Sequence, residues 1–227
     1  MKNEKQIAGE KAAEFVKDGM VVGLGTGSTV LYTIKKIGER VKDGLSITAV
    51  ATSIQTEQLA KECGIPLVNL ADIDVIDVAI DGADEVDAAF NLIKGGGGAL
   101  LREKIIASSA QEFIIVADSS KMVKQLGRFP IPVEVEMFGY PLTGKKIQSI
   151  GGVPKLRMNE GKPFVTDNGN YIFDCEFAAI SSPEKLELNL NLIPGVVENG
   201  LFIDLVDLLI TVDQKQEAVI QKRNEDG

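Results

Sequence analysis

Apolar side chains recur at helical spacing from about residue 3 to residue 17, and Asp18-Gly19 marks the end of that helix. A short apolar run at 20–24 is typical of a buried strand, and the glycine-rich segment 25–29 separates it from a helical pattern that continues to about Val41. The same alternation predicts strands at 47–51, 67–70, 75–80 and 113–117 and helices at 52–64 and 99–110. It therefore predicts an α/β fold, with a mostly parallel sheet covered by helices on both faces.

The pattern changes after Gly127, where most of the chain's eight prolines and shorter β-like runs occur. The β-like runs at 132–136, 164–165 and 171–174 interleave with helical patterns at 142–150 and 183–192. This predicts a small α+β domain at 128–202, inserted before a last strand at 205–212 that returns to the main sheet. The main domain then comprises residues 1–127 and 203–227, and we expect the tail 224–227 to fray.

The composition is that of an ordinary globular protein, with 44% hydrophobic and 25% charged residues among 227. The 24 basic and 33 acidic residues give a net charge of −9, which argues against a nucleic-acid partner or an anionic membrane surface. The longest uncharged run, 19–34, is too short to span a bilayer. Cys63 and Cys175 fit neither a CxxC pair nor a disulfide framework, so we expect a reducing, cytoplasmic location.

The chain contains no histidine. This excludes Ser-His-Asp and Cys-His nucleophile pairs, histidine metal ligands and imidazole bases. Acid–base chemistry near neutral pH must then use carboxylates, lysine, tyrosine or cysteine.

The first candidate site is the turn Gly25–Thr29, which lies between a predicted strand and a predicted helix. Such a turn directs backbone N–H groups and the helix dipole at an anion. No lysine precedes Ser28 as a P-loop requires, and no acidic residue ends the second strand as a dinucleotide site requires. We therefore expect it to bind a small phosphate group; the alternative is a tight turn that merely needs glycine.

The second candidate is a carboxylate pair, Asp81 and Asp84, after the predicted strand 75–80. Ligands of open α/β sheets bind at the carboxyl ends of strands, and Gly82 allows the sharp turn that brings Asp84 back. The spacing does not exclude Mg²⁺. Other acids of this stretch are expected to form a solvated face, namely Asp72, Asp74, Glu85 and Asp87.

The third candidate begins at Lys94 and continues through four glycines to Glu103. Ordering successive glycines is costly, so a backbone that lies against a ligand and presents N–H groups is one explanation. The alternative is a flexible loop followed by a solvated glutamate. Three successive strand-to-helix turns each supply part of one constellation, and Lys121, after the strand 113–117, completes its rim.

Together these motifs resemble those of the ribose-5-phosphate isomerases of the A type. The resemblance depends on GTGST at 25–29, DGADEVD at 81–87, KGGGGALLREK at 94–104 and ADSSK at 117–121. It extends through FPIPVEV at 129–135, VTDNGN at 165–170 and IPGVVENGLF at 193–202.

The resemblance implies a Rossmann-like main domain and a smaller ferredoxin-like domain. It implies interconversion of ribose 5-phosphate and ribulose 5-phosphate in the non-oxidative branch of the pentose phosphate pathway, with no metal or organic cofactor. It further implies a homodimer or homotetramer whose partner is a small sugar phosphate, with neither nucleic acid nor membrane involved.

The resemblance also implies residue roles. Glu103 is the base that carries a proton between C2 and C1 through a cis-enediolate, Asp81 and Lys94 handle the O1 and O2 protons and ring opening, and Asp84 assists. Lys5 reaches the phosphate. The residues implied to bind substrate are Thr26, Gly27, Ser28, Thr29, Gly82, Ala83, Gly95, Gly96, Gly97 and Lys121.

Other functions remain open from the residues alone. A sugar-phosphate sensor would use the same phosphate cradle without catalysis. A phosphatase would use Asp81 as nucleophile and need Mg²⁺, and a CoA-transferase-like activity is a further alternative on a similar sheet. Activity in excess EDTA distinguishes the isomerase from the phosphatase.

Overall fold

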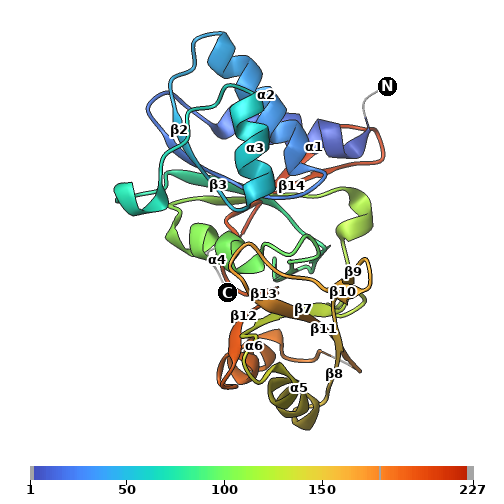
Figure 1. Ribbon diagram of the computed structural model, residues 1–227. Coiled ribbons are helices and arrows are strands. Elements are labelled where there is room, and N and C mark those ends of the chain that lie inside the picture. The colour runs from blue at the N-terminus through green and yellow to red at the C-terminus, as the bar shows by residue number, and fades with distance from the viewer. Residues whose placement is uncertain (1–2, 179, 224–227) are drawn as a thin grey trace. The chain divides into compact units, whose positions relative to one another are not determined.

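The computed structural model describes residues 3–178 and 180–223, and its chain folds as two compact units (Figure 1). The first unit comprises Met1–Ala83, Arg102–Met122 and Leu205–Gly227, and the second comprises Asp84–Leu101 and Val123–Asp204. The stretch Asp84–Leu101 thus groups with the second unit, whereas the sequence pattern assigns it to the main domain. The predicted fraying of 224–227 lies outside the described residues.

The first unit is built on a six-stranded sheet in the order β15-β14-β6-β3-β1-β2. All neighbouring pairs are parallel except β14 and β15, which are antiparallel. Its strands are β1 (Val21–Leu24), β2 (Thr48–Ala51), β3 (Val78–Gly82), β6 (Phe113–Val116), β14 (Leu208–Val212) and β15 (Ala218–Lys222). Because the chain runs from β1 to β2 on one side and then returns to β3 on the other, the strand order reverses at β1. Open α/β sheets bind ligands at such a reversal, beyond the carboxyl ends of the strands.

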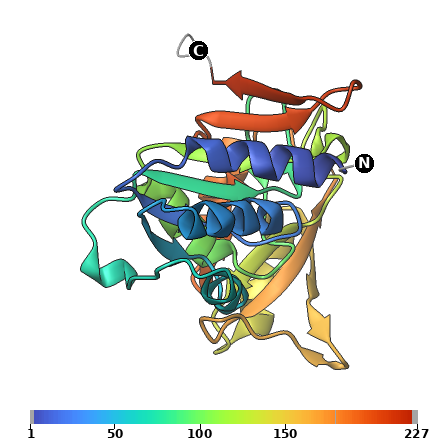
Figure 2. The same ribbon diagram turned by 90° about the horizontal axis from the view of Figure 1, so that it is seen from above.

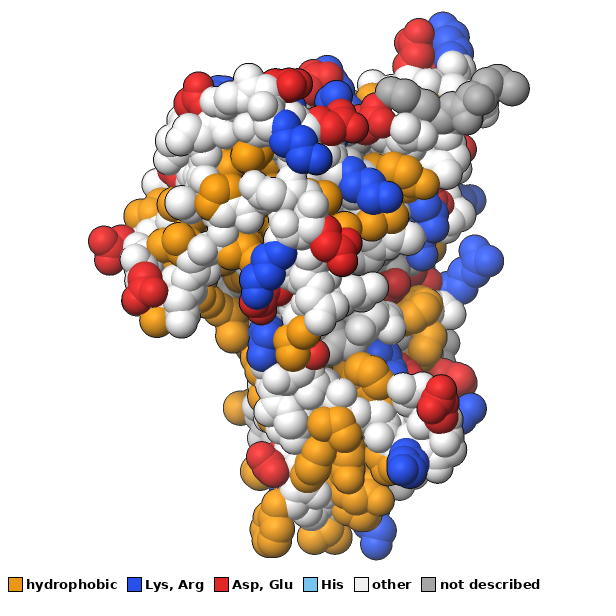
Figure 3. Space-filling view, turned by 45° about the horizontal axis from the view of Figure 1, so that its top comes forward, with side chains coloured by type: hydrophobic (Ala, Val, Ile, Leu, Met, Phe, Trp, Pro, Cys, Tyr) orange, Lys and Arg blue, Asp and Glu red, His pale blue; other side chains and the backbone are white. Residues whose placement is uncertain are grey.

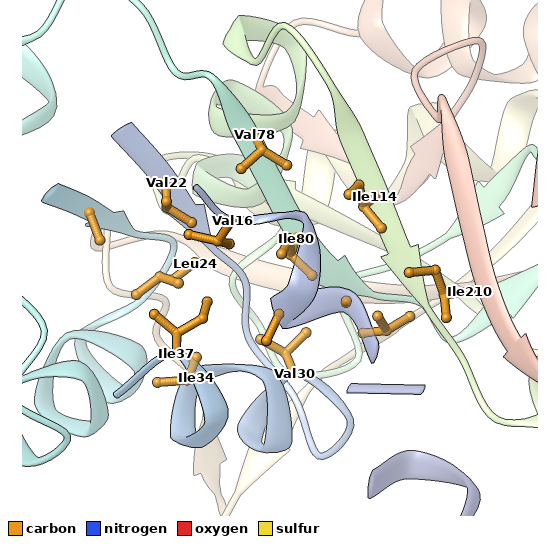
Figure 4. Close-up of a cluster of buried hydrophobic side chains, with 14 of the residues drawn as sticks. Val16, Val22, Leu24, Val30, Ile34, Ile37, Val78, Ile80, Ile114 and Ile210 are labelled. Atoms are coloured by element: carbon orange, nitrogen blue, oxygen red, sulfur yellow. The ribbon is translucent and has the colours of Figure 1, made fainter. Parts of the chain in front are cut away.

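Helices cover both faces of this sheet. Val22 and Leu24 of β1 point into a core shared with the first two helices, which Figure 4 shows in close-up. Figure 2 shows the ribbons of α1 and α2 from above. Gly23, between them, faces the other way, where a Cβ would lie 2.5 Å from Ile106. The helical segments are α1 (Glu4–Ala12), η1 (Ala13–Phe15), α2 (Val30–Lys42), α3 (Ile54–Glu62), η2 (Leu70–Asp72), α4 (Leu100–Ser109) and η3 (Ser119–Lys121).

The second unit has a four-stranded antiparallel sheet in the order β12-β7-β11-β8. Along the chain, β7, α5, β8, β11, α6 and β12 follow one another, so the ferredoxin-like βαββαβ arrangement is confirmed. These elements are β7 (Ile131–Val135), α5 (Tyr140–Ser149), β8 (Gly152–Leu156), β11 (Tyr171–Phe177), α6 (Pro183–Asn191) and β12 (Val196–Asn199). The unit also contains the hairpin β9 (Met158–Asn159) and β10 (Lys162–Pro163) and the small sheet of β4 (Glu85–Val86), β5 (Leu92–Ile93) and β13 (Leu201–Phe202).

Several predicted elements are corrected. The strand at 67–70 is reduced to one bridge from Leu67 to Ala49, because the Asn69 carboxamide caps the 3-10 turn η2 instead. The run 164–165 is not a strand: the strand β10 lies just before it at Lys162–Pro163, and the Phe164 N–H donates to the Arg157 carbonyl at 2.9 Å. Strand β15 was missed, because its exposed edge position leaves little hydrophobic alternation. No helix among the described residues is long and apolar enough to cross a membrane.

Candidate active site

The loop after β1 is held against the end of β3. The Gly25 N–H donates to the Ile80 carbonyl at 2.9 Å, and the Thr26 N–H donates to Asp81 Oδ1 at 3.0 Å. The Gly82 N–H reaches the same oxygen at 2.7 Å. A Cβ at Gly25 would lie 2.2 Å from the Asp81 carboxyl carbon, so only glycine fits there. The predicted phosphate turn and the predicted carboxylate therefore meet at the reversal point of the sheet.

Asp81 lies inside the strand rather than after it. It pairs with Ile115 of β6, and its side chain is 2% exposed. The predicted strand 75–80 is thus displaced, because Val75 is 44% exposed and the pairing with β1 begins only at Val78.

A cluster of hydroxyl groups surrounds Thr26 and helps to hold the loop after β1. Thr26 Oγ1 lies 2.7 Å from Thr52 Oγ1, 2.8 Å from Ser53 Oγ and 3.0 Å from Thr56 Oγ1. Thr56 Oγ1 in turn donates to the Gly25 carbonyl at 2.8 Å. No local sequence pattern indicates this role of the three partners. Ser53 is the N-cap of α3, and its side chain accepts the Thr56 N–H.

The tip of the loop is open, with Gly27 and Ser28 exposed. Thr29, the N-cap of α2, makes no side-chain capping bond, and the Leu31 and Tyr32 N–H groups donate to the Gly27 and Thr29 carbonyls, each at 3.1 Å. The positive end of the α2 dipole thus lies beside the exposed tip. Gly9 allows α1 to approach Thr29 closely, and Lys5 Nζ donates to Ser28 Oγ at 2.8 Å. A cation, a hydroxyl group and a helix N-terminus thus meet at one point of the first unit.

Glu103 lies in the first turn of α4 and is 4% exposed. The alternative of a solvated helix residue is therefore wrong. Lys121 ends the short helix η3, whose N-cap Asp118 accepts the Ser120 N–H at 3.1 Å. The Ser119 N–H donates to Glu4 of α1 at 2.8 Å, so α1 contacts both the Ser28 loop and this segment.

Other predicted residues lie in the second unit. The Asp84 N–H donates to the Ile93 carbonyl at 2.8 Å, and Asp84 Oδ2 accepts the Gly96 N–H at 2.8 Å. Lys94 is 2% exposed, and its ammonium lies 5.5 Å from the centre of the Phe202 ring. The Gly98 N–H donates to the Gly95 carbonyl at 2.9 Å. The four glycines thus form an ordered turn, not the flexible loop of the alternative interpretation.

The acidic stretch is only partly a solvated face. Asp72 and Asp74 are exposed, as predicted. Glu85 is 3% exposed, because its carboxylate accepts the N–H groups of Gly127 and Phe129 at 2.8 and 2.6 Å. The prediction for Glu85 was wrong, since a partner more than forty residues away along the chain cannot be recognised from local pattern.

Cysteine chemistry is disfavoured at neutral pH. Burial raises the pKa of the Cys63 thiol, and burial together with the neighbouring Asp174 carboxylate raises the pKa of Cys175. Neither thiol is therefore a ready nucleophile. Among residues 3–178 and 180–223, no group of three His, Cys, Asp or Glu side chains is placed to hold a metal ion.

Comparison with known proteins agrees with the geometry. Residues 48–216 match the family model described as ribose 5-phosphate isomerase A (phosphoriboisomerase A). The chain belongs to this family. It is 54% identical over 225 residues to ribose-5-phosphate isomerase A of Bacillus mycoides, covering 99% of this chain and 98% of the relative. It is 50% identical over 224 residues to the Listeria innocua protein of the same name, and the match covers 98% of this chain and 100% of that relative.

Solved structures of the family superimpose on nearly the whole chain. The Methanocaldococcus jannaschii ribose 5-phosphate isomerase A has a TM-score of 0.91 at 42% identity, covering 96% of this chain and 97% of the other. A D-ribose-5-phosphate isomerase in complex with phospho-erythronic acid has a TM-score of 0.94 at 43% identity, covering 98% and 100%. Family membership makes this chain an enzyme of the isomerase class and confirms the fold that the resemblance implied.

Proposed function

We propose that this chain interconverts D-ribose 5-phosphate and D-ribulose 5-phosphate, as the names of its relatives indicate. The observation that carries the proposal is the burial of three ionisable side chains in the predicted motifs. Asp81 and Lys94 are each 2% exposed, and Glu103 is 4% exposed. Burying charged groups is costly, so such groups concentrate where chemistry needs them.

The reaction needs a base that moves one proton between neighbouring carbons. In the proposed mechanism, the Glu103 carboxylate removes the C2 proton of the open-chain aldose, leaving a cis-enediolate, and returns the proton to C1. Loss of the proton on O2 and gain of one on O1 complete the ketose, so no atom is gained or lost. A carboxylate base suits a chain without histidine.

The enediolate oxygens need a positive potential that is in place before the reaction. We assign this to the Lys94 ammonium and to the glycine turn Gly95–Gly97, with the Gly95 and Gly97 N–H groups as donors and the Gly96 N–H bonded to Asp84. Asp81 moves the proton between O2 and O1, and Asp84 assists by holding the turn through Gly96. Gly82 and Ala83 contribute backbone contacts beside Asp81.

The phosphate needs local positive potential, because the net charge of the chain is −9. We assign its binding to the amides and hydroxyl groups of the turn Thr26–Thr29, in which Thr26 holds the loop through Asp81, and to Lys5, which already bonds Ser28, and Lys121.

The decisive experiment is to incubate the purified chain with ribose 5-phosphate in excess EDTA and to follow ketose formation by absorbance. We expect turnover, with solvent deuterium incorporated at the carbon that receives the proton. Glu103→Gln should fold normally and lose about 10²–10⁴-fold in kcat, the usual contribution of a general base. The matched control is Glu62→Gln, which changes an exposed carboxylate of α3 and should leave kcat unchanged. Near-normal kcat in Glu103→Gln would exclude Glu103 as the base.

We also propose that the chain forms a homodimer or homotetramer. Large hydrophobic side chains gather on the second unit (Figure 3). Phe138 is 91% exposed, and Leu188 and Leu192, one turn apart, are 62% and 78% exposed. Light scattering should give a multiple of 24.4 kDa, and Leu188→Lys with Leu192→Lys should lower it. The cytoplasmic location remains a prediction, which the two free cysteines fit, and the pathway remains a prediction as well.

A further inference from the structure

Arg157 connects two parts of the second unit that are distant in sequence. It directly follows β8, and its backbone is fixed between the Ile172 carbonyl and the Phe164 N–H. Its guanidinium makes a two-pronged ion pair with Asp174 of β11, in which Nε lies 3.0 Å from Oδ2 and Nη2 contacts Oδ1. The remaining nitrogen, Nη1, donates to the carbonyls of Gly95 and Gly96 at 3.0 and 3.3 Å.

These two carbonyl contacts determine where the neighbouring N–H groups point. The peptide bonds are trans, and in a trans peptide the C=O and the following N–H point in opposite directions. With the Gly95 and Gly96 carbonyls turned to Arg157, the N–H groups of Gly96 and Gly97 point to the opposite side. The Gly96 N–H does so by donating to Asp84 Oδ2.

The end of the same turn is fixed by an aromatic ring. A Cβ at Gly98 would lie 2.6 Å from the Phe164 ring, and the Arg157 guanidinium carbon lies 5.8 Å from the centre of that ring. Gly98 has φ +82°, a conformation in which a side chain would be strained. The ring and the guanidinium thus hold the turn at its last and first residues.

We propose that Arg157, oriented by Asp174, is a positioning residue that holds the Gly95–Gly97 turn with its N–H groups and Asp84 in the reactive arrangement. We call the contacts of Arg157 with Asp174, Gly95 and Gly96 the clamp. Its expected effect on rate rests on the proposed isomerase function, but the clamp itself does not. An arginine suits this task and a lysine does not, because a rigid planar fork can bond a carboxylate and two carbonyls at once.

The position can be probed chemically, because the clamp borders a cavity of about 470 Å³ that Gly96, Arg157 and Asp174 help to line. Replacing Arg157 with alanine opens space there for a guanidinium ion from solution. We expect Arg157→Ala to lower kcat about 10²-fold, the cost of misplacing reactive groups by about 1 Å, and to change KM by less than about threefold. Added guanidinium chloride should restore about tenfold of the lost kcat, and sodium chloride at equal ionic strength should restore none.

The matched control is Lys155→Ala, which removes a cation from the same cavity. Among the described residues, Arg157 and not Lys155 donates to the carbonyls of the turn. The kcat of Lys155→Ala and its response to guanidinium should therefore equal those of the unchanged chain. A kcat within about twofold of normal in Arg157→Ala would overturn the proposal, as would a loss that guanidinium does not restore.

A second variant and a second readout cover the case in which Arg157→Ala does not fold. Asp174→Asn keeps the side-chain shape and removes the charge that orients the fork, so kcat should fall about tenfold. Amide hydrogen exchange of a peptide that covers 94–99 should be about tenfold faster in either variant. Unchanged exchange and kcat in Asp174→Asn would refute the clamp. If the unchanged chain does not isomerise ribose 5-phosphate, the proposed function fails, whereas the exchange result still decides the clamp.

Discussion

Two glycine-rich turns of this molecule are held in place by different kinds of group. The turn at Gly25–Thr29 is fixed by the strand beside it, since Gly25 bonds Ile80 and Thr26 bonds Asp81. The turn at Gly95–Gly98 is fixed by side chains, namely Asp84, Arg157 and Phe164. The first is thus part of a parallel sheet, and the second is a loop held from outside.

The difference explains how each turn presents its N–H groups. In the first turn the exposed tip at Gly27 and Ser28 lies at the positive end of the α2 dipole, which favours a fixed dianion. In the second, the Gly95 and Gly96 carbonyls accept hydrogen bonds from the Arg157 guanidinium, so the amides that follow them face away from it. We infer that the first turn is suited to binding a phosphate and the second to stabilising charge that develops during the reaction.

The sharpest test of how the first turn is held is Gly25→Ala. The new Cβ would lie 2.2 Å from the Asp81 carboxyl carbon and 2.6 Å from its Cα, so the backbone must separate. Because both Thr26 and Asp81 move, we expect kcat/KM to fall about 10³-fold or more, with a loss of about 1–3 kcal/mol in the free energy of unfolding. Steady-state kinetics and urea unfolding measure the two effects.

The control for that variant is Gly19→Ala, where a Cβ meets nothing within 4 Å but φ is +82°. It should cost about 1 kcal/mol of stability through backbone strain alone and leave kcat/KM unchanged. If Gly25→Ala behaved in the same way, the close approach of the loop to Asp81 would have no functional meaning.

The second turn is tested next by removing the cation at its start. Lys94→Met keeps the aliphatic stem beside Phe202 and removes the ammonium, so the fold should persist. We expect kcat to fall about 10²–10³-fold, as for the loss of one oxyanion donor, with little change in KM. Lys124→Met, at an exposed position of the same unit, is the control. A higher KM with unchanged kcat would instead indicate that Lys94 binds the phosphate and does not act at the reacting carbons.

Much of the arrangement of the turn at Gly25–Thr29 could be predicted from sequence. A glycine-rich segment between a buried strand and a helix, and an aspartate at the end of another strand, are local patterns, and the parallel sheet brings them together. What could not be predicted was the register, which places Asp81 within β3 beside Ile115. The hydroxyl partners of Thr26 were also invisible, because no local pattern indicates which hydroxyl groups meet.

For the turn at Gly95–Gly98, the sequence predicts only that glycine is abundant there. Four glycines indicate a backbone that must be held, but not what holds it. Arg157 and Phe164 follow the turn by sixty residues or more and lie in segments without a recognisable pattern; the run around Phe164 was even taken for a strand. Glu85 was misassigned for the same reason, since its partners are the distant amides of Gly127 and Phe129. Contacts of this kind depend on tertiary structure alone.

A smaller effect distinguishes binding from turnover in the first turn. Lys5 is half-buried in the first turn of α1, and its hydrogen bond to Ser28 is exposed to solvent, so solvent screens its charge. We expect Lys5→Gln to raise KM for ribose 5-phosphate about fivefold at low ionic strength and to leave kcat unchanged, with the difference shrinking as salt screens the interaction. Lys11→Gln, on the same helix but paired with Glu14, should change neither constant. A fall in kcat would place Lys5 in the chemical step.

The smallest effect is expected from thiol modification, which touches neither turn. Burial raises the pKa of both thiols above the ordinary value, so the reactive thiolate is scarce at neutral pH and becomes more abundant as the pH rises. Iodoacetamide should therefore label the half-buried Cys63 slowly at pH 7 and faster at higher pH, and the buried Cys175 more slowly still. Turnover should persist in the Cys63-labelled protein, as checked by mass spectrometry and the isomerase assay together. Rapid inactivation at pH 7 would instead indicate a thiolate that takes part in the reaction.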